Sequence, residues 1–99
     1  MTTLHICKIE CYNCHQEYNA TYKKRNIDGH IFISSPDDFS DTNKDIAKEN
    51  GVIIKTLGYG NPNEPKIFTA NICPHCGSPF GNNYIKDLIG KEIKSINLS

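Results

Sequence analysis

The sequence predicts a small α+β fold, and three observations lead to this class. The chain has 99 residues, of which 37% are hydrophobic, so it can bury only a modest core. Short alternating or β-branched segments separated by turn residues predict several strands. One segment in the middle of the chain has the pattern of a helix. The length fits one domain, residues 1–99, of a size that often needs a metal ion or disulfides for stability.

Two strands joined by a tight turn are predicted at the start of the chain. Residues 4–10 alternate roughly between apolar and polar side chains, as a short strand does. Residues 16–24 resume the alternation with Tyr18, Ala20 and Tyr22 on one face. The two segments therefore predict a hairpin around residues 11–15.

A strand–helix–strand insertion is predicted at about residues 26–65. The turn signal Asp28-Gly29 precedes an apolar run at 30–34, which predicts a strand. Residues 52–57 form a β-branched run that predicts another strand, and the composition of residues 58–65 predicts a loop.

The helix of this insertion is predicted at about residues 41–50. Ser40 or Asp41 supplies the N-cap, and Ile46 and Ala47 stand at the apolar helical positions. Gly51 stands where a helix stop belongs. The capping residues and the apolar spacing thus agree on one helix.

The last part of the chain is predicted to contain a strand at residues 66–72 and a further element at residues 84–96. In the latter segment the spacing of five apolar side chains favours a helix. Gly90 and the β-branched residues are also compatible with a strand.

Charge and terminal composition restrict the function classes. Eleven basic and eleven acidic side chains cancel, whereas domains built for duplex binding usually carry a basic excess. The N-terminal residues lack the pattern of a secretory signal, and no apolar run has the length of a membrane span. We therefore expect a soluble, cytoplasmic protein whose thiols stay reduced.

Two Cys-x-x-Cys pairs are the most informative motif of the chain. They are Cys11-Tyr-Asn-Cys14 and Cys73-Pro-His-Cys76. In a reducing compartment such pairs are metal ligands or redox groups rather than structural disulfides. Four thiolates in two pairs are the usual ligands of a structural, tetrahedral zinc site. The sequence therefore predicts one structural Zn²⁺ per chain, held by Cys11, Cys14, Cys73 and Cys76, with iron in the same site as an alternative.

The residues around the pairs fit turns that hold a metal. The position after the second cysteine often needs a left-handed backbone, which Gly77 adopts easily and for which His15 is among the better non-glycine residues. His15 and His75 are expected to make local hydrogen bonds. Cys7 is expected to be a small buried strand residue, with a spare ligand or redox thiol as its alternative role.

These two turns resemble the knuckles of the zinc-ribbon and rubredoxin-like families. The segment from Thr69 to Tyr84 is also similar to the C-terminal part of small uncharacterised zinc-ribbon proteins of bacteria and their phages, in which Ala-Asn precedes the second knuckle and Gly and an aromatic residue follow it. The resemblance does not cover the middle of the chain. It implies a metal-binding fold with two knuckles on β-hairpins and implies no settled activity.

Three functions remain open at this stage. The preferred one is a non-enzymatic, zinc-binding interaction module with a protein partner. A nucleic-acid-binding zinc ribbon is the second, because Lys23, Lys24 and Arg25 could contact phosphates and Tyr22 could stack on a base. A thiol-disulfide oxidoreductase that uses Cys73 and Cys76 is the third.

Overall fold

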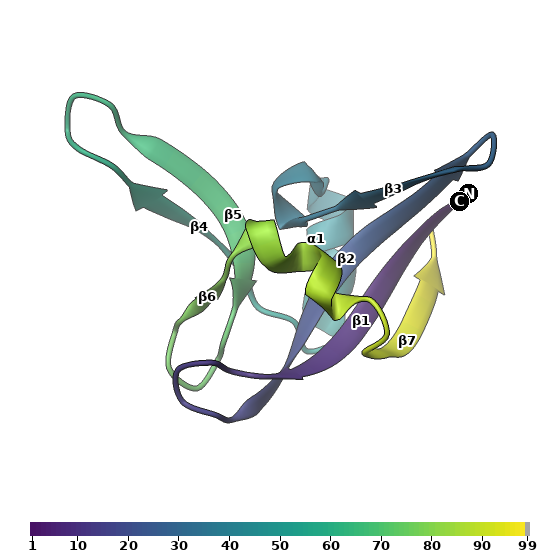
Figure 1. Ribbon diagram of the computed structural model, residues 1–99, viewed down its shortest axis with the longest axis horizontal. Coiled ribbons are helices and arrows are strands. Elements are labelled where there is room, and N and C mark those ends of the chain that lie inside the picture. The colour runs from purple at the N-terminus through teal and green to yellow at the C-terminus, as the bar shows by residue number, and fades with distance from the viewer. Residues whose placement is uncertain (99) are drawn as a thin grey trace.

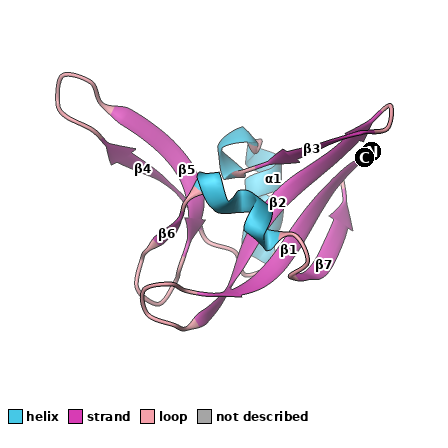
Figure 2. Ribbon diagram, viewed as in Figure 1, coloured by secondary structure: helices cyan, strands magenta, loops and turns pink. Residues whose placement is uncertain are grey.

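The computed structural model describes residues 1–98 and contains two antiparallel sheets that meet near the centre of the molecule (Figure 1). The predicted α+β class is confirmed. In the described residues, one α-helix and two short 3₁₀ helices accompany seven strands (Figure 2).

The larger sheet has the strand order β3-β2-β1-β7. The predicted hairpin is present. Each residue of β1 pairs with a residue of β2, from Thr2–Arg25 to Glu10–Glu17. The first cysteine pair lies in the turn that joins these two strands. The bounds of the four strands are Thr2–Glu10 (β1), Glu17–Ile27 (β2), His30–Ser34 (β3) and Glu92–Asn97 (β7).

The smaller sheet has the strand order β4-β5-β6. Its strands are Ile54–Tyr59 (β4), Lys66–Ile72 (β5) and Pro79–Phe80 (β6), and the second cysteine pair lies between β5 and β6. The predicted strand at residues 66–72 is confirmed. Strand β4 begins and ends two residues later than predicted, so it takes in residues 58 and 59 of the expected loop. The hairpin of β4 and β5 extends away from the rest of the molecule (Figure 1).

The predicted helix is confirmed as α1, Asp41–Glu49. Ser40 is its N-cap, and Ser40 and Asn43 form a reciprocal capping box in which the Ser40 hydroxyl accepts from the Asn43 N–H at 3.2 Å. Gly51 follows with a positive φ of 80°. Within residues 1–98, every helix is too short or too polar to cross a membrane.

Strand β1 separates two hydrophobic clusters, because its two faces are both covered. Leu4 and Ile6 contact the cluster that includes Ala47 of α1. Cys7 and Ile9 face the opposite way, into a cluster that reaches the metal-ligand candidates Cys11 and Cys73. Two elements close these clusters from outside, α1 on one face and a 3₁₀ helix, η2 (Asn82–Leu88), on the other. A second 3₁₀ helix, η1 (Pro36–Asp38), precedes α1.

The helix favoured for residues 84–96 is wrong. The segment is divided at Gly90, whose φ of 96° is outside the helical region. Before it, Ile85 and Leu88 of η2 are buried in the core, and after it β7 pairs with β1. The apolar spacing that favoured a helix therefore belongs to two short elements.

A buried amide joins the two sheets at Thr21. Asn71 of β5 is fully buried, and its side chain accepts from the Thr21 N–H at 2.9 Å and donates to the Thr21 carbonyl at 3.1 Å. Strand β3 pairs with β2 only from Lys23 onward, so the Asn71 amide supplies the partner that the β2 backbone lacks here. Buried backbone groups without such a partner would be strongly destabilising.

We predict that Asn71→Ala lowers the free energy of unfolding by about 2–4 kcal/mol, because it leaves two buried backbone groups of Thr21 unsatisfied. Denaturant unfolding of the metal-loaded protein measures this change. The control is Asn83→Ala at an exposed position, which should alter stability by less than about 0.5 kcal/mol. Equal effects of the two substitutions would contradict the joining role of Asn71.

Candidate metal centre

The first cysteine turn is a closed loop held by two backbone hydrogen bonds. The His15 N–H donates to the Cys11 carbonyl at 2.9 Å, and the Cys11 N–H donates to the Gln16 carbonyl at 2.9 Å. His15 adopts the left-handed conformation predicted for this position, with a φ of 63°. The turn therefore directs Cys11 and Cys14 to the same side.

The second turn repeats this geometry bond for bond. The Gly77 N–H donates to the Cys73 carbonyl at 2.8 Å, and the Cys73 N–H donates to the Ser78 carbonyl at 2.9 Å. Gly77 has a φ of 79°, which confirms its predicted left-handed conformation. Two turns from distant parts of the chain thus share one structure.

The two turns bring the four predicted cysteines together. Their Sγ atoms all lie within 4.8 Å of one another. The Sγ atoms of Cys11 and Cys76 are 3.6 Å apart, and those of Cys14 and Cys73 are 3.7 Å apart. In a tetrahedral site with metal–sulfur bonds of about 2.3 Å, the sulfur atoms are separated by about 3.8 Å. The donor set and its spacing therefore fit a single four-coordinate metal ion.

Nearby polar groups stabilise negative charge on Cys76. The Ser78 hydroxyl lies 3.2 Å from its Sγ, and the Asn13 side-chain amide donates to the same sulfur at 3.6 Å. Hydrogen bonds from the Ser78 side chain and backbone lower the pKa of Cys76 to about 6. A thiolate at this position is thus favoured at neutral pH.

The pKa of Cys14 is shifted in the opposite direction, upward, when no cation is present. The backbone of Gln16 lowers the pKa of Cys14, but burial and the thiols of Cys73 and two other cysteines outweigh it and raise this pKa to about 12. Close thiols resist losing all their protons because the resulting charges repel one another. A bound divalent cation removes this restriction, since metal ligands must be deprotonated.

Burial makes the centre part of the core on one side and open to solvent on the other. Cys11 and Cys73 are buried and contact the same hydrophobic cluster as Tyr18. Cys14 is partly buried and Cys76 is exposed. The centre therefore links the two sheets through their buried ligands and presents its other ligands toward the surface.

Cys7 lies outside the four-cysteine group, so it is not a spare ligand. It is fully buried, and its Sγ contacts the Leu88 carbonyl at 3.5 Å. Burial, and secondarily the charge of Glu92, raise its pKa to about 12, which disfavours a reactive thiolate. The expectation of a small buried strand residue is confirmed.

The two histidines beside the ligands were expected to make local hydrogen bonds, but the side-chain hydrogen bond of His75 is to a residue distant in sequence and His15 makes only a longer contact. The His75 ring nitrogen Nε2 lies 3.1 Å from the Glu17 carbonyl, which connects the second turn to β2. His15 Nδ1 lies 3.6 Å from the Glu10 carboxylate in an exposed pair.

The predicted nucleic-acid contacts all lie on β2, but they do not form one binding surface. Tyr22 is 2% exposed, stacks on His5 with ring centroids 4.9 Å apart, and donates its hydroxyl to Glu92. It therefore offers no free ring face to a base. Lys23 donates to the Asp38 carbonyl at 3.0 Å and to Asn43, and its ammonium lies over the Phe39 ring.

Lys24 and Arg25 complete the predicted basic cluster. Lys24 is partly buried and Arg25 is exposed. They stand at neighbouring positions of β2, whose residues alternate between the two faces of the sheet. The cluster of three cations therefore does not form one continuous binding surface.

Sequence reasoning missed several residues that shape the centre. Asn13 and Ser78 form hydrogen bonds with the ligand sulfurs, and Tyr12 and Phe80 form an aromatic surface beside it. The only sequence signal was position, since these residues lie within or directly after the cysteine pairs.

The fold and the site define a small α+β protein with a four-cysteine cluster suited to a metal ion. Searches of protein-family models, curated proteins and solved structures gave no significant match. The chemistry of the site therefore rests on its own geometry.

We predict that Gly77→Ala costs about 1–2 kcal/mol of stability through its backbone alone. A Cβ at Gly77 would meet no atom within 4 Å, but alanine disfavours a positive φ. Gly58→Ala is the control, because its new Cβ would only reach ordinary contact at 3.9 Å and Gly58 lacks a positive φ. Thermal unfolding with metal bound would show a cost for Gly77→Ala only; a cost of similar size at Gly58 would refute the conformational explanation.

We also predict that Cys73→Ser abolishes stoichiometric metal binding, whereas Cys7→Ser preserves it and costs about 1–2 kcal/mol. Cys73 is one of the four clustered donors and Cys7 is not. Metal analysis of the purified variants and their melting temperatures separate the two effects. Loss of the metal in Cys7→Ser, or its retention at full occupancy in Cys73→Ser, would overturn the assignment of the ligands.

Proposed function

We propose that this chain is a non-enzymatic interaction module of the zinc-ribbon type, which holds one structural Zn²⁺ and binds a protein partner. The observation that carries the proposal is the group of four cysteine sulfurs within 4.8 Å, supplied by two equivalent turns. Tetrahedral four-thiolate sites are typical of structural zinc.

Zinc is preferred because two paired Cys-x-x-Cys turns are the usual ligand set of a structural zinc site. A structural zinc site has four protein ligands and leaves no position open for a substrate. Iron in four thiolates remains the competing choice, and geometry alone does not separate the two metals. The metal would supply folding energy here rather than reaction chemistry.

The surroundings of the second pair support a non-enzymatic role. In thiol oxidoreductases a helix that starts at the cysteine pair lowers the pKa of the attacking thiol. Here the residues after Cys76 form a turn and then β6, and the next helical element begins only at Asn82. Cys73, the residue that would attack a disulfide, is fully buried.

A protein partner is favoured over nucleic acid by the distribution of charge and aromatic side chains. The net charge is zero, and Lys23 and Tyr22 are engaged within the fold. Tyr12 and Tyr84 are instead 68% and 63% exposed beside the metal centre. Exposed aromatic side chains of this kind are enriched in protein interfaces.

Native mass spectrometry and elemental analysis test the metal directly. We expect one zinc ion per chain, and we expect removal of zinc by a chelator under reducing conditions to unfold the protein or to lower its melting temperature strongly. A metal-free chain that keeps its fold and melting temperature would contradict the proposal. Catalytic reduction of a disulfide substrate by the metal-free chain would instead support the oxidoreductase.

A further inference from the structure

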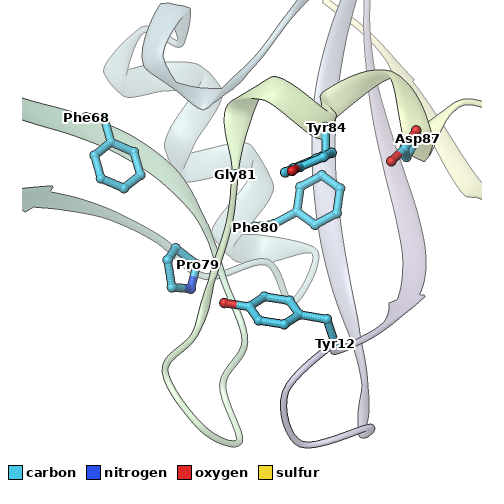
Figure 3. A pocket seen from close by; sticks show the side chains of 7 residues that line it. All are labelled: Tyr12, Phe68, Pro79, Phe80, Gly81, Tyr84 and Asp87. Atoms are coloured by element: carbon cyan, nitrogen blue, oxygen red, sulfur yellow. The ribbon is translucent and has the colours of Figure 1, made fainter.

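An open aromatic hollow of about 560 Å³ lies beside the metal centre. Its volume falls in the range of sites that bind small molecules or single side chains. Figure 3 shows the rings of Phe80 and Tyr84 next to one another, with Tyr12 facing them across the opening. The lining residues are Tyr12, Phe68, Pro79, Phe80, Gly81, Tyr84 and Asp87.

The first cysteine turn and strand β6 build two walls of this hollow. Tyr12 lies between the ligands Cys11 and Cys14, and β6, which carries Phe80, directly follows the second turn. The third wall is η2, where the ring of Tyr84 packs over Gly81: a Cβ added at Gly81 would lie 3.3 Å from that ring. The hollow is therefore a product of the folded centre and not of one segment.

The charge of the hollow is negative. Asp87 is the only charged residue among those that line it, and no described residue forms a salt bridge or hydrogen bond with its exposed carboxylate. A neighbouring hollow shares Phe68 and Gly81, and its only charged lining residue is Asp37. Four thiolates around a divalent ion add two further negative charges nearby, if the proposed zinc is bound.

We propose that this hollow binds an arginine side chain of the protein partner. Aromatic faces attract a cation through their quadrupole, and a guanidinium is planar, stacks on such rings and pairs with a carboxylate through two parallel hydrogen bonds. The exposed rings of Tyr12 and Tyr84 and the carboxylate of Asp87 supply both kinds of contact. This inference rests on the proposed function for its protein partner and deepens it by naming the recognised group.

Arginine is chosen over lysine for a physical reason. A lysine ammonium is a compact and strongly hydrated charge, whereas a guanidinium is more weakly hydrated and can lie flat on a ring. A wide and half-open aromatic hollow with its carboxylate at one side suits the larger and planar group. Arginine is also enriched among the residues that dominate protein interfaces.

NMR titration of isotope-labelled, zinc-loaded protein with acetyl-Gly-Arg-Gly-amide tests the proposal. We expect saturable shifts at Tyr12, Phe80, Gly81, Tyr84 and Asp87, with weak affinity because one side chain makes few contacts. The matched peptide with citrulline in place of arginine has the same shape without the charge. It should bind about tenfold more weakly, since both the cation–π contact and the ion pair are lost.

Two variants locate the effect. Asp87→Asn should weaken arginine-peptide binding about two- to fivefold, because an exposed ion pair contributes modestly. It should leave zinc content and melting temperature unchanged, since Asp87 has no described partner to lose. The control Glu49→Gln removes the same charge from an exposed position of α1, on the opposite side of the larger sheet, and should leave binding unchanged.

Each other outcome overturns the proposal. Equal shifts with arginine and citrulline peptides, shifts centred elsewhere, equal effects of Asp87→Asn and Glu49→Gln, or no shifts at millimolar peptide would each refute the arginine site. Shifts at these residues with a single-stranded oligonucleotide in place of the peptide would refute it in favour of nucleic acid. Zinc analysis of the same samples keeps the two proposals distinct. If zinc-loaded protein does not bind the peptide, only the arginine site is refuted.

Discussion

The mutual repulsion of four thiolates at close range is the constraint on which this structure depends. Thiolates whose sulfur atoms lie within 4.8 Å of one another repel, and burial together with the neighbouring thiols raises the pKa of Cys14. A single divalent ion would relieve this repulsion by binding two cysteines from the turn of the larger sheet and two from the turn of the smaller sheet. The same ion would therefore fix both turns and the contact between the sheets.

The rest of the fold is arranged around this contact. Strand β1 separates two clusters, and only one of them, with Cys7, Ile9 and Tyr18, contacts the buried ligands. Asn71 makes a second, polar connection between the sheets at Thr21. Links of different kinds thus join the sheets, and the aromatic hollow forms beside the four cysteines. Binding at that hollow would therefore depend on an ordered metal centre.

The features predicted from sequence were those determined by neighbouring residues. The four-cysteine group, the left-handed conformations of His15 and Gly77 and the helix capped by Ser40 all follow from local motifs. The segment at 84–96 was misjudged because Gly90 ends η2 and pairing with β1 makes the remainder a strand, which spacing alone does not reveal. Tyr22 was a candidate for stacking on a base, but packing against His5 and Glu92 buries it. The hollow combines residues from the first cysteine turn, β5, β6 and η2, so no local pattern marked it.

The most direct test of the shared ion is a cadmium–proton correlation spectrum of protein in which Cd²⁺ replaces the native metal. Scalar couplings across metal–sulfur bonds identify the ligands without mutation. The account predicts one cadmium signal that correlates with the β-protons of Cys11, Cys14, Cys73 and Cys76 and not with those of Cys7. Two cadmium signals, each coupled to one turn, or any correlation to Cys7, would contradict the claim that a single ion joins the two sheets.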